Sequence, residues 1–332
     1  MKIQFYLRFS TQYGQSLFVS GNCDGLGNNE LAAAVPMQYL TDEFWTATIE
    51  LNKDFENDLQ YYYILQNENG EQVIEWGDDR VIEVMKMQVD ELTLIDTWNH
   101  AGEFENAFYT QPFQQVLLPK RKEGKSKSLK NVTHIFKVKA PLLKADEVLC
   151  VSGSNATLTK WSTTEPVLMQ CEGNWWTARL NFSNDSFPVA YKYGVFNTKT
   201  KTFVGFENGN NRILYDSYGK KKISILQDGF AQLPNSTWKG AGVAIPVFSL
   251  RSNQSMGVGE FTDINLLVDW AEKVSLRMIQ LLPVNDTTST QLTVVIVPTI
   301  GDYDMNTFAV ELGRAWGVGQ KGKNNGLILL WS

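Results

Sequence analysis

The N-terminal third of the chain alternates apolar and polar positions. Ile3, Phe5, Leu7 and Phe9 occupy every second position, which is the period of a half-buried strand. Residues 16–20, 44–51 and 60–66 are further strand candidates, and Asn69-Gly70 is a typical hairpin turn. Short strands without a convincing helix predict an antiparallel, immunoglobulin-like β-sandwich over residues 1–112.

After Pro234 the pattern changes. Residues 242–250 form an apolar strand candidate, and Asp263 can cap a helix whose apolar positions fall at helical spacing. These positions are Ile264, Leu267, Val268, Ala271 and Val274. Residues 277–283 are a second apolar strand. Strand, helix and strand in this order predict a βαβ unit with parallel strands.

The β-rich pattern occurs twice, at an offset of 130 to 132 residues. The repeated landmarks are Val19-Ser20-Gly21 with Val151-Ser152-Gly153, Phe44-Trp45 with Trp175-Trp176, Tyr61-Tyr62-Tyr63 with Tyr191-Lys192-Tyr193, Trp76 with Phe206, and Arg80-Val81 with Arg212-Ile213. A constant offset over five landmarks indicates a duplicated domain of about one hundred residues. The second copy is predicted over residues 132–232.

A charged segment separates the two copies. We predict a linker over residues 113–131, because residues 120–130 combine Lys, Gly and Ser without periodicity. A phosphate-binding site is the alternative interpretation of its lysines, and a solvated linker is the simpler one.

Composition excludes several classes of function. The 332 residues carry a net charge of −6, so the chain lacks the basic field that nucleic acids or anionic lipids attract. Three cysteines without CxxC spacing and two histidines give little material for disulfides, metal sites or His-based catalysis. Apolar runs such as 294–297 are too short to span a membrane. We expect a cytosolic protein without cofactor or metal, and with no nucleic-acid or membrane partner.

Aromatic residues near the turns are candidates for a binding surface. They are Trp161, Trp175, Trp176 and Phe206 in the second copy, and Trp45, Tyr62 and Trp76 in the first. An exposed Trp or Tyr packs on the apolar face of a sugar ring, while polar neighbours bind its hydroxyls. Sandwich aromatics also fill cores. Because neighbours on a strand face opposite sides, at most one of Trp175 and Trp176 is expected in the core.

The second copy resembles a starch-binding module of carbohydrate-binding family 20. The resemblance rests on Val-Ser-Gly, the turn Leu158-Thr159-Lys160-Trp161, the strand Ala190-Tyr191-Lys192-Tyr193 and the segment from Phe206 to Arg212. It implies a glucan site made of Trp161, Lys192, Phe206, Glu207 and Asn211. Phe206 stands where the family has Trp. The first copy matches less well, since Asn28 stands at the turn Trp and Tyr62 replaces the Lys, although Trp76 fits.

The third segment resembles the opening of glycoside hydrolase family 77, the amylomaltases or 4-alpha-glucanotransferases. The matching stretches are 241–251, 257–263 and 280–286. The resemblance implies that residues 238–290 begin a (β/α)8 barrel. Two starch-binding modules before such a barrel are the arrangement of the plant-type cytosolic disproportionating enzymes, which act on maltose, starch, amylose or soluble heteroglycan.

The family mechanism implied by this resemblance is a retaining transfer, in which one carboxylate attacks the anomeric carbon and a second acts as acid and then base. About 95 residues follow Thr237, against roughly 250 for a complete barrel. We therefore expect no catalytic residue in this chain, and Asp263 serves as a helix cap. Asn285 and Asp286 line a barrel mouth or form an ordinary turn. Residues 291–332 are a divergent tail, and a lone βαβ unit is expected to leave strand edges unpaired.

Three functions remain open. The chain belongs to a glucanotransferase, or it is a non-catalytic glucan-binding protein, or it is a β-sandwich interaction scaffold whose aromatics are all core.

Overall fold

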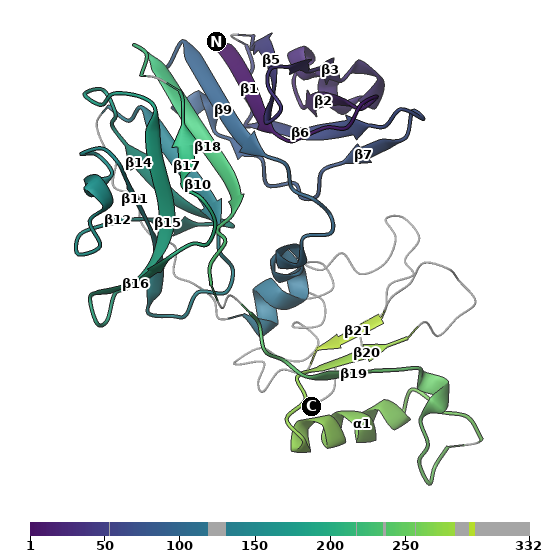
Figure 1. The fold of residues 1–332 in the computed structure, drawn as a ribbon. Helices are drawn as coiled ribbons and strands as arrows, with labels where there is room; N and C mark the ends of the chain where they lie inside the picture. The colour runs from purple at the N-terminus through teal and green to yellow at the C-terminus, as the bar shows by residue number, and fades with distance from the viewer. Residues whose placement is uncertain are drawn as a thin grey trace. The chain divides into compact units, whose positions relative to one another are not determined.

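The structure, a computed structural model, describes residues 1–52, 54–118, 131–216, 218–234, 237–255 and 257–282 and the backbone of 292–295. The chain divides into two compact units (Figure 1). Met1–Tyr109 and Arg121–Ser236 form the first, and Thr110–Lys120 and Thr237–Ser332 form the second.

The first module is a sandwich of two sheets. Its strands are β1 (Lys2–Arg8), β2 (Ser16–Gly21), β3 (Val35–Pro36), β4 (Gln38–Tyr39), β5 (Phe44–Glu50), β6 (Leu59–Gln66), β7 (Gln72–Ile74), β8 (Val81–Ile82) and β9 (Glu91–Thr97). One sheet has the order β4-β5-β1-β9, and the other has β3-β2-β6-β7 with β8 also paired to β6. Every second residue of β1 is buried, as its alternation predicts. Short 3-10 turns connect the strands: η1 (Asp24–Asn29), η2 (Leu31–Ala33), η3 (Val84–Lys86) and η4 (Phe104–Tyr109).

The second module repeats this arrangement. Its strands are β10 (His134–Lys139), β11 (Glu147–Gly153), β12 (Val167–Leu168), β13 (Gln170–Glu172), β14 (Trp175–Leu180), β15 (Val189–Asn197), β16 (Thr202–Phe206), β17 (Arg212–Leu214) and β18 (Lys222–Phe230), with the turn η6 (Thr159–Trp161). The sheets are β13-β14-β10-β18 and β12-β11-β15-β16, with β17 paired to β15.

The repeated tyrosines belong to the two cores. Tyr61 and Tyr63 are buried in the first module and Tyr191 and Tyr193 in the second. The first ring of each pair packs edge-on against a Phe of the first strand, at centroid distances of 5.3 Å and 5.1 Å. The same edge-on contact in both modules supports the inferred duplication, and it favours such ring pairs beyond area burial alone.

The two modules share one continuous sheet. Strand β9 pairs with β18 (Figure 1), so that eight strands run in the order β13-β14-β10-β18-β9-β1-β5-β4. The prediction of purely antiparallel sandwiches was wrong, because β1 pairs with β9, β10 with β18, and β9 with β18 in parallel. The first and last strands of each module run side by side in the same direction, which alternation along the sequence cannot reveal.

Polar side chains cross this junction. Gln227 on β18 is fully buried, and its Nε2 donates to Tyr61 Oη at 2.6 Å and to Asp96 Oδ1 at 3.0 Å. In the opposite direction, Arg8 Nη1 donates to Asp228 Oδ1 at 3.3 Å. Each module therefore completes a buried hydrogen-bond cluster of the other.

The two buried aspartates at this junction have different pKa values. Each accepts hydrogen bonds from two tyrosine hydroxyls of its own module. Burial raises the pKa of Asp96, because Arg80 offsets the desolvation only in part. Burial also acts to raise the pKa of Asp228, but Arg212 and Arg8 outweigh it and hold that pKa below its ordinary value. The second guanidinium explains the difference.

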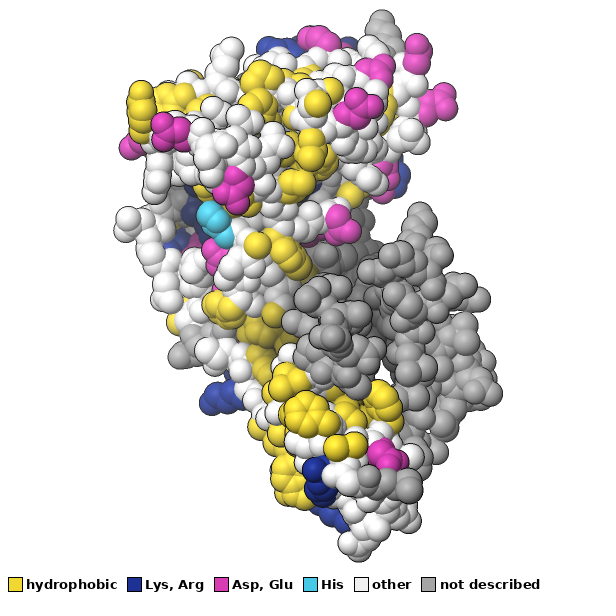
Figure 2. Space-filling model, turned by 90° about the vertical axis from the view of Figure 1, so that its right-hand side faces the viewer, with side chains coloured by type: hydrophobic (Ala, Val, Ile, Leu, Met, Phe, Trp, Pro, Cys, Tyr) yellow, Lys and Arg dark blue, Asp and Glu magenta, His cyan; other side chains and the backbone are white. Residues whose placement is uncertain are grey.

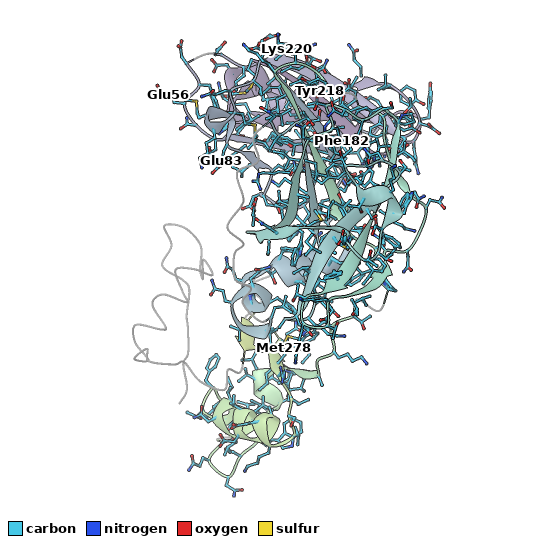
Figure 3. The ribbon with its side chains drawn as sticks, turned by 90° about the vertical axis from the view of Figure 1, so that its left-hand side faces the viewer. Glu56, Glu83, Phe182, Tyr218, Lys220 and Met278 are labelled. Atoms are coloured by element: carbon cyan, nitrogen blue, oxygen red, sulfur yellow. The ribbon has the colours of Figure 1, made fainter. Side chains whose placement is uncertain are left out.

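His134 is buried at the edge of the second core. Its ring packs against Phe182, labelled in Figure 3, and stacks on Phe187. Its Nδ1 lies 2.9 Å from Thr133 Oγ1. Burial lowers the pKa of His134 to about 4, and only Asp216, with its carboxylate 3.9 Å from Nε2, acts in the other direction.

The second unit contains the predicted βαβ element. Strands β19 (Gly242–Ile245) and β20 (Met278–Leu281) pair in parallel, and helix α1 (Asp263–Lys273) connects them. The first strand ends at Ile245, earlier than predicted, because Pro246 follows and starts the turn η7 (Val247–Ser249). Apolar side chains are visible on the surface of this unit (Figure 2). Within the described residues, no helix is long and apolar enough to cross a bilayer.

Strand β21 (Leu292–Val295) pairs antiparallel with β20. The expectation that strand edges stay unpaired was therefore wrong for this edge of β20. An antiparallel neighbour also departs from the parallel order of a (β/α)8 barrel.

Asp263 acts at the start of α1. Its carboxylate accepts a hydrogen bond from the backbone N–H of Glu260 at 2.8 Å and another from Ser255 Oγ at 2.8 Å. The predicted capping role is wrong, because Thr262 is the N-cap residue, Asp263 is the first residue of the helix, and the amide that Asp263 binds precedes the helix.

Several predictions fall outside the described residues. Most of the predicted linker, residues 119–130, is among them, and so are Asn285, Asp286 and the tail apart from 292–295. The start of the predicted linker is not irregular, because Phe113–Leu117 forms the short helix η5.

Candidate functional site

The repeated Val-Ser-Gly motif holds a turn in each module. In the second module Ser152 Oγ donates to Leu158 O at 3.2 Å, and the N–H of Gly153 donates to the same oxygen at 2.9 Å. A Cβ on Gly153 would lie 2.5 Å from Ala190 O and 2.6 Å from Leu158 Cδ1, so only glycine fits. Leu158 is fully buried. The residues after Leu158 are therefore presented from a fixed anchor.

The turn presents Trp161 in a strained backbone conformation. Thr159, Lys160 and Trp161 have φ angles of 59°, 48° and 62°. Residues other than glycine rarely adopt positive φ, and each such residue costs on the order of 1–3 kcal/mol. Such strain persists where the surroundings impose it, and it is common at binding sites.

The ring of Trp161 is half-buried and meets Phe206 edge-on, with the centroids 6.2 Å apart and the planes at 80°. Phe206 contacts Phe203 on the same strand at a centroid distance of 4.6 Å. The predicted pair is therefore brought together. Phe203 was missed by the sequence analysis, although its place in the short aromatic strand β16 is a signal for it.

Lys192 lies on strand β15 and Asn211 lies on the loop that Lys192 contacts. Lys192 alternates with the buried Tyr191 and Tyr193 on β15, so its side chain faces outward. Its Nζ donates to Gly209 O at 2.7 Å. Asn211 is exposed directly before β17. The Lys192 contact ties the strand to the loop 207–211, which carries the other predicted site residues.

Glu207 differs from its neighbours because its carboxylate is already engaged. It is 4% exposed and forms a bidentate ion pair with Arg212, both oxygens at 2.9 Å. The backbone N–H groups of Tyr193 and Gln232 donate to it as well. The structure therefore places Glu207 beneath the surface, where it holds Phe206 and the loop in position.

The first module has the same turn with different residues. Gly27, Asn28 and Asn29 have φ angles of 74°, 51° and 66°, at the positions of Thr159, Lys160 and Trp161. The backbone bond from Asn28 N to Cys23 O matches the bond from Lys160 N to Asn155 O. The residue opposite Trp161 is therefore Asn29, and the assignment to Asn28 was wrong by one position.

The remaining first-module candidates are scattered. Trp45 is 9% exposed and belongs to the core cluster of the first module. Tyr62 is half-buried, and its hydroxyl donates to Asn29 O at 3.4 Å. Trp76 is half-buried and its backbone N–H donates to Asn99 O. Trp45 thus offers little surface to a ligand.

Trp175 and Trp176 face opposite sides of β14, as predicted, yet both are buried, at 6% and 4% exposed. Trp176 belongs to the core of the second module. Trp175 lies under Lys137 and Lys139, whose Nζ atoms are 5.1 Å and 4.6 Å from its ring centroid. The expectation that only one of them is covered was wrong, because the eight-stranded sheet was not foreseen.

Comparison with known families finds three matching models. The model described as starch binding domain matches residues 1–93 and 131–225, more than half of the chain. The model described as 4-alpha-glucanotransferase matches residues 245–298, and the model described as TPM domain matches residues 278–332. The last two matches overlap between residues 278 and 298. The match to the 4-alpha-glucanotransferases ends at residue 298.

Among curated relatives, the chain is 31% identical over 302 residues to 4-alpha-glucanotransferase DPE2 of Oryza sativa subsp. japonica, covering 85% of this chain and 31% of that protein. It is 44% identical over 48 residues to the 4-alpha-glucanotransferase of Chlamydia trachomatis, covering 14% of this chain and 9% of that protein. The chain thus spans about a third of the rice relative.

Solved structures similar to parts of the chain include the glucoamylase of Hormoconis resinae, at 28% identity and a TM-score of 0.27, covering 31% of this chain and 18% of that one. Another is the family 20 carbohydrate-binding module of the maltotetraose-forming amylase from Pseudomonas saccharophila, at 15% identity and a TM-score of 0.25. This match covers 29% of this chain and 97% of that one. From the matched residues, the chain belongs to the starch-binding-domain family, with two copies of that domain ahead of a segment that matches the 4-alpha-glucanotransferases.

Proposed function

We propose that the second module binds α-glucan chains on the surface formed by Trp161, Phe206, Lys192 and Asn211. The observation that carries the proposal is the strained turn, in which three consecutive residues with positive φ hold Trp161 against Phe206. Two aromatic rings set edge-on offer apolar faces to successive sugar rings. The Lys192 ammonium and the Asn211 amide supply donors and an acceptor for sugar hydroxyls at the rim.

In this proposal Glu207 is a positioning residue. Among the described residues, the hydrogen bonds of its carboxylate go to Arg212 and to two backbone amides. It fixes the backbone at Phe206, and Arg212 fixes the backbone after Asn211. A glucan hydroxyl would have to displace a buried ion pair to reach it, which costs several kcal/mol.

The first module contributes less to glucan binding. Asn29 stands where the second module has Trp161, and Tyr62 stands where it has Lys192, so the first module lacks both the platform and the cation. Gly27, Asn28 and Asn29 also tolerate positive φ at little cost. This turn therefore stores no strain that a binding role would explain.

We propose further that the chain contributes the glucan-binding part of a 4-alpha-glucanotransferase that transfers glucosyl units from maltose-type donors to starch, amylose or soluble heteroglycan. Support comes from the order of the matched segments and from the rice relative. The β19–α1–β20 unit would then be the first part of a (β/α)8 barrel. A non-catalytic glucan-binding protein is the second candidate, since β21 pairs antiparallel where a barrel has parallel strands.

The free cysteines are compatible with a reducing compartment such as the cytosol. Cys23 and Cys150 are buried free thiols, and burial raises the pKa of Cys150 to about 12. Such a thiol stays protonated and unreactive at neutral pH. We therefore propose a cytosolic location, which fractionation of cells that express the tagged full-length protein would test.

The test of glucan binding is the substitution Trp161→Asn. It removes the ring and places at this turn the residue that the first module uses at the same φ, so the turn itself is retained. Loss of one aromatic platform should weaken β-cyclodextrin binding by about 1–3 kcal/mol, or roughly five- to 150-fold, in calorimetry on the whole chain. The whole chain is required because an isolated second module would lose its β9 neighbour.

The control is Tyr218→Asn, which removes a 46% exposed aromatic of the same module beyond β17. It should leave the affinity unchanged. Equal affinities of the unsubstituted chain and Trp161→Asn would exclude this surface as the main site.

A further inference from the structure

Three residues of the proposed glucan surface adjoin polar residues that face the interior. Phe206 precedes Glu207, Asn211 precedes Arg212, and Lys192 lies between Tyr191 and Tyr193. Glu207 is 4% exposed, and both tyrosines are fully buried. Binding residues keep their geometry when the groups behind them are fixed by packing and hydrogen bonds. The interior polar groups therefore decide how well the surface is preorganised.

These interior groups converge on one carboxylate, that of Asp228. The hydroxyls of Tyr191 and Tyr193 donate to its Oδ2 at 2.8 Å and 2.7 Å. Arg212 Nη1 donates to the backbone O of Asp228 at 3.2 Å and lies 3.8 Å from its Oδ1. The same guanidinium binds both carboxylate oxygens of Glu207. The charge and position of Asp228 therefore affect strand β15 and the loop 207–211 together.

A cation from the first module reaches the same carboxylate. Arg8 ends strand β1, and its Nη1 donates to Asp228 Oδ1 at 3.3 Å across β9, the strand between β1 and β18. Contacts within the first module hold this side chain in place. Its Nε donates to Glu43 at 2.9 Å, its Nη1 donates to Thr97 at 3.3 Å, and its guanidinium carbon lies 5.1 Å from the ring centroid of Phe44. Arg8 is therefore anchored in one module while it binds in the other.

The first module has the matching cluster with a different partner. The Oδ2 of Asp96 accepts hydrogen bonds from Tyr61 and Tyr63, and Arg80 lies 3.3 Å from its Oδ1. The group that reaches this Oδ1 from the other module is the amide of Gln227, at 3.0 Å. A neutral donor thus stands where the second cluster has a guanidinium.

The two clusters therefore differ in charge. In the first, the ion pairs of the described residues join two carboxylates to one guanidinium, Glu75 and Asp96 to Arg80. In the second, they join two carboxylates to two guanidiniums, Glu207 and Asp228 to Arg212 and Arg8. Burial raises the pKa of Asp96, whereas the two guanidiniums outweigh burial at Asp228 and hold its pKa below the ordinary value. The balanced cluster lies in the module that carries the aromatic platform.

We propose that Arg8 of the first module is a positioning residue for the glucan surface of the second. It balances the charge of Asp228, and this carboxylate in turn holds the tyrosines beside Lys192 and the guanidinium beside Asn211. Arg8 acts through Asp228 and needs no contact with the glucan. The role rests on the proposed glucan-binding function, and it gives the first module a part in recognition although that module lacks the aromatic platform.

The test is Arg8→Gln in the 332-residue chain, with the affinity for β-cyclodextrin measured by calorimetry at neutral pH. The substitution gives the second cluster the charge of the first, in which the amide of Gln227 serves Asp96. Because the first module folds around such a cluster, the variant is expected to fold. The pair of Glu207 and Arg212 remains, so the affinity should fall roughly three- to tenfold.

Two variants separate this role from the stability of the junction. Arg8→Lys keeps the charge and should retain most of the affinity, since Lys139 at the equivalent position of the second module reaches Asp79 of the first at 2.7 Å. Gln227→Leu removes polar contacts across the same junction, but these contacts end on the cluster of the first module. It should lower the stability and leave the affinity unchanged.

The pH profile of binding is a reading that a merely structural role would not change. Arg8, Arg212 and the hydroxyls of Tyr191 and Tyr193 face Asp228. With Arg8 present, Asp228 stays ionised, and the affinity should be level from about pH 8 to about pH 5. In Arg8→Gln the pKa of Asp228 should rise. The carboxylate then gains a proton as the pH falls and accepts the two hydroxyls less strongly, so the affinity should decrease toward the acid end of this range.

An Arg8→Gln chain with unchanged affinity and a level pH profile would overturn the positioning role and leave the surface site standing. Equal losses in Arg8→Gln and Gln227→Leu would also overturn it, because the junction as a whole would then be the cause. Trp161→Asn tests the surface site separately. Equal affinities of that variant and the unsubstituted chain would overturn the surface site, and the positioning role with it.

Discussion

Gln227→Leu is expected to destabilise the unit that the two modules form. The Nε2 of Gln227 donates to Tyr61 Oη at 2.6 Å and to the Asp96 carboxylate at 3.0 Å. A neutral hydrogen bond contributes about 0.5–1.5 kcal/mol and one to a charged group about 1.5–3 kcal/mol. Leucine has a similar size, and it recovers about 1 kcal/mol by burial of apolar carbon. We expect a net loss of about 1–3.5 kcal/mol.

The measurement is chemical denaturation of the 332-residue chain, followed by tryptophan fluorescence, with the transition midpoint compared between variants. The control is Gln72→Leu. Gln72 lies on the exposed strand β7, and the substitution removes its hydrogen bond to Gln66 on β6. A surface change of this kind should stay within about 0.5 kcal/mol.

A Gln227→Leu chain as stable as the unsubstituted one, or more stable, would refute the argument. Buried polar groups are sometimes replaced by apolar ones without loss. The pairing of β9 with β18 and the apolar contacts would then hold the modules together alone.

Two further predictions concern the same unit. Because burial lowers the pKa of His134 to about 4, while an unfolded histidine titrates near 6.5, only the unfolded chain gains this proton as the pH falls between these values. The native state should lose up to roughly 3 kcal/mol over that range, and His134→Gln should flatten this part of the stability profile; identical profiles would contradict the assignment. Trypsin cleavage within the lysine-rich residues 120–130 should leave two fragments that elute together on size exclusion, because β9 and β18 stay paired. Separate elution at micromolar concentration would show that the junction is weak.

Features with a local cause could be predicted from the sequence. Alternation located β1, because one face of this strand is buried, and β2, β5 and β6 lie at the strand candidates 16–20, 44–51 and 60–66. The helical spacing after Asp263 located α1, and the order of elements gave the parallel pair β19 and β20. The repeated Val-Ser-Gly was recognised from the sequence as a landmark. The structure explains why its last residue is glycine, because a Cβ on Gly153 would clash with Ala190 O.

Contacts between the modules could not be predicted from the repeat. The constant spacing of 130 to 132 residues identifies equivalent positions in the two modules, and it does not indicate which surfaces of the modules contact each other. Arg8 and Lys139 occupy equivalent positions, and each reaches an aspartate of the other module, Asp228 and Asp79. Trp175 is buried for the same reason. Polar residues at these positions of otherwise apolar strands are the only sequence signal, and it does not identify the partner.

The two modules kept the same turn and changed what it carries. The φ angles agree within about 15° at three successive positions, so both sets of side chains are compatible with the same left-handed backbone at this turn. The first module fills the turn with Gly27, Asn28 and Asn29, which adopt positive φ readily. The second fills it with Thr159, Lys160 and Trp161, which do not. The first module shows that this turn can be built from residues that adopt positive φ at little cost. The second module keeps the strained residues, and the position of the Trp161 ring best explains this. The strain therefore supports glucan binding through the second module.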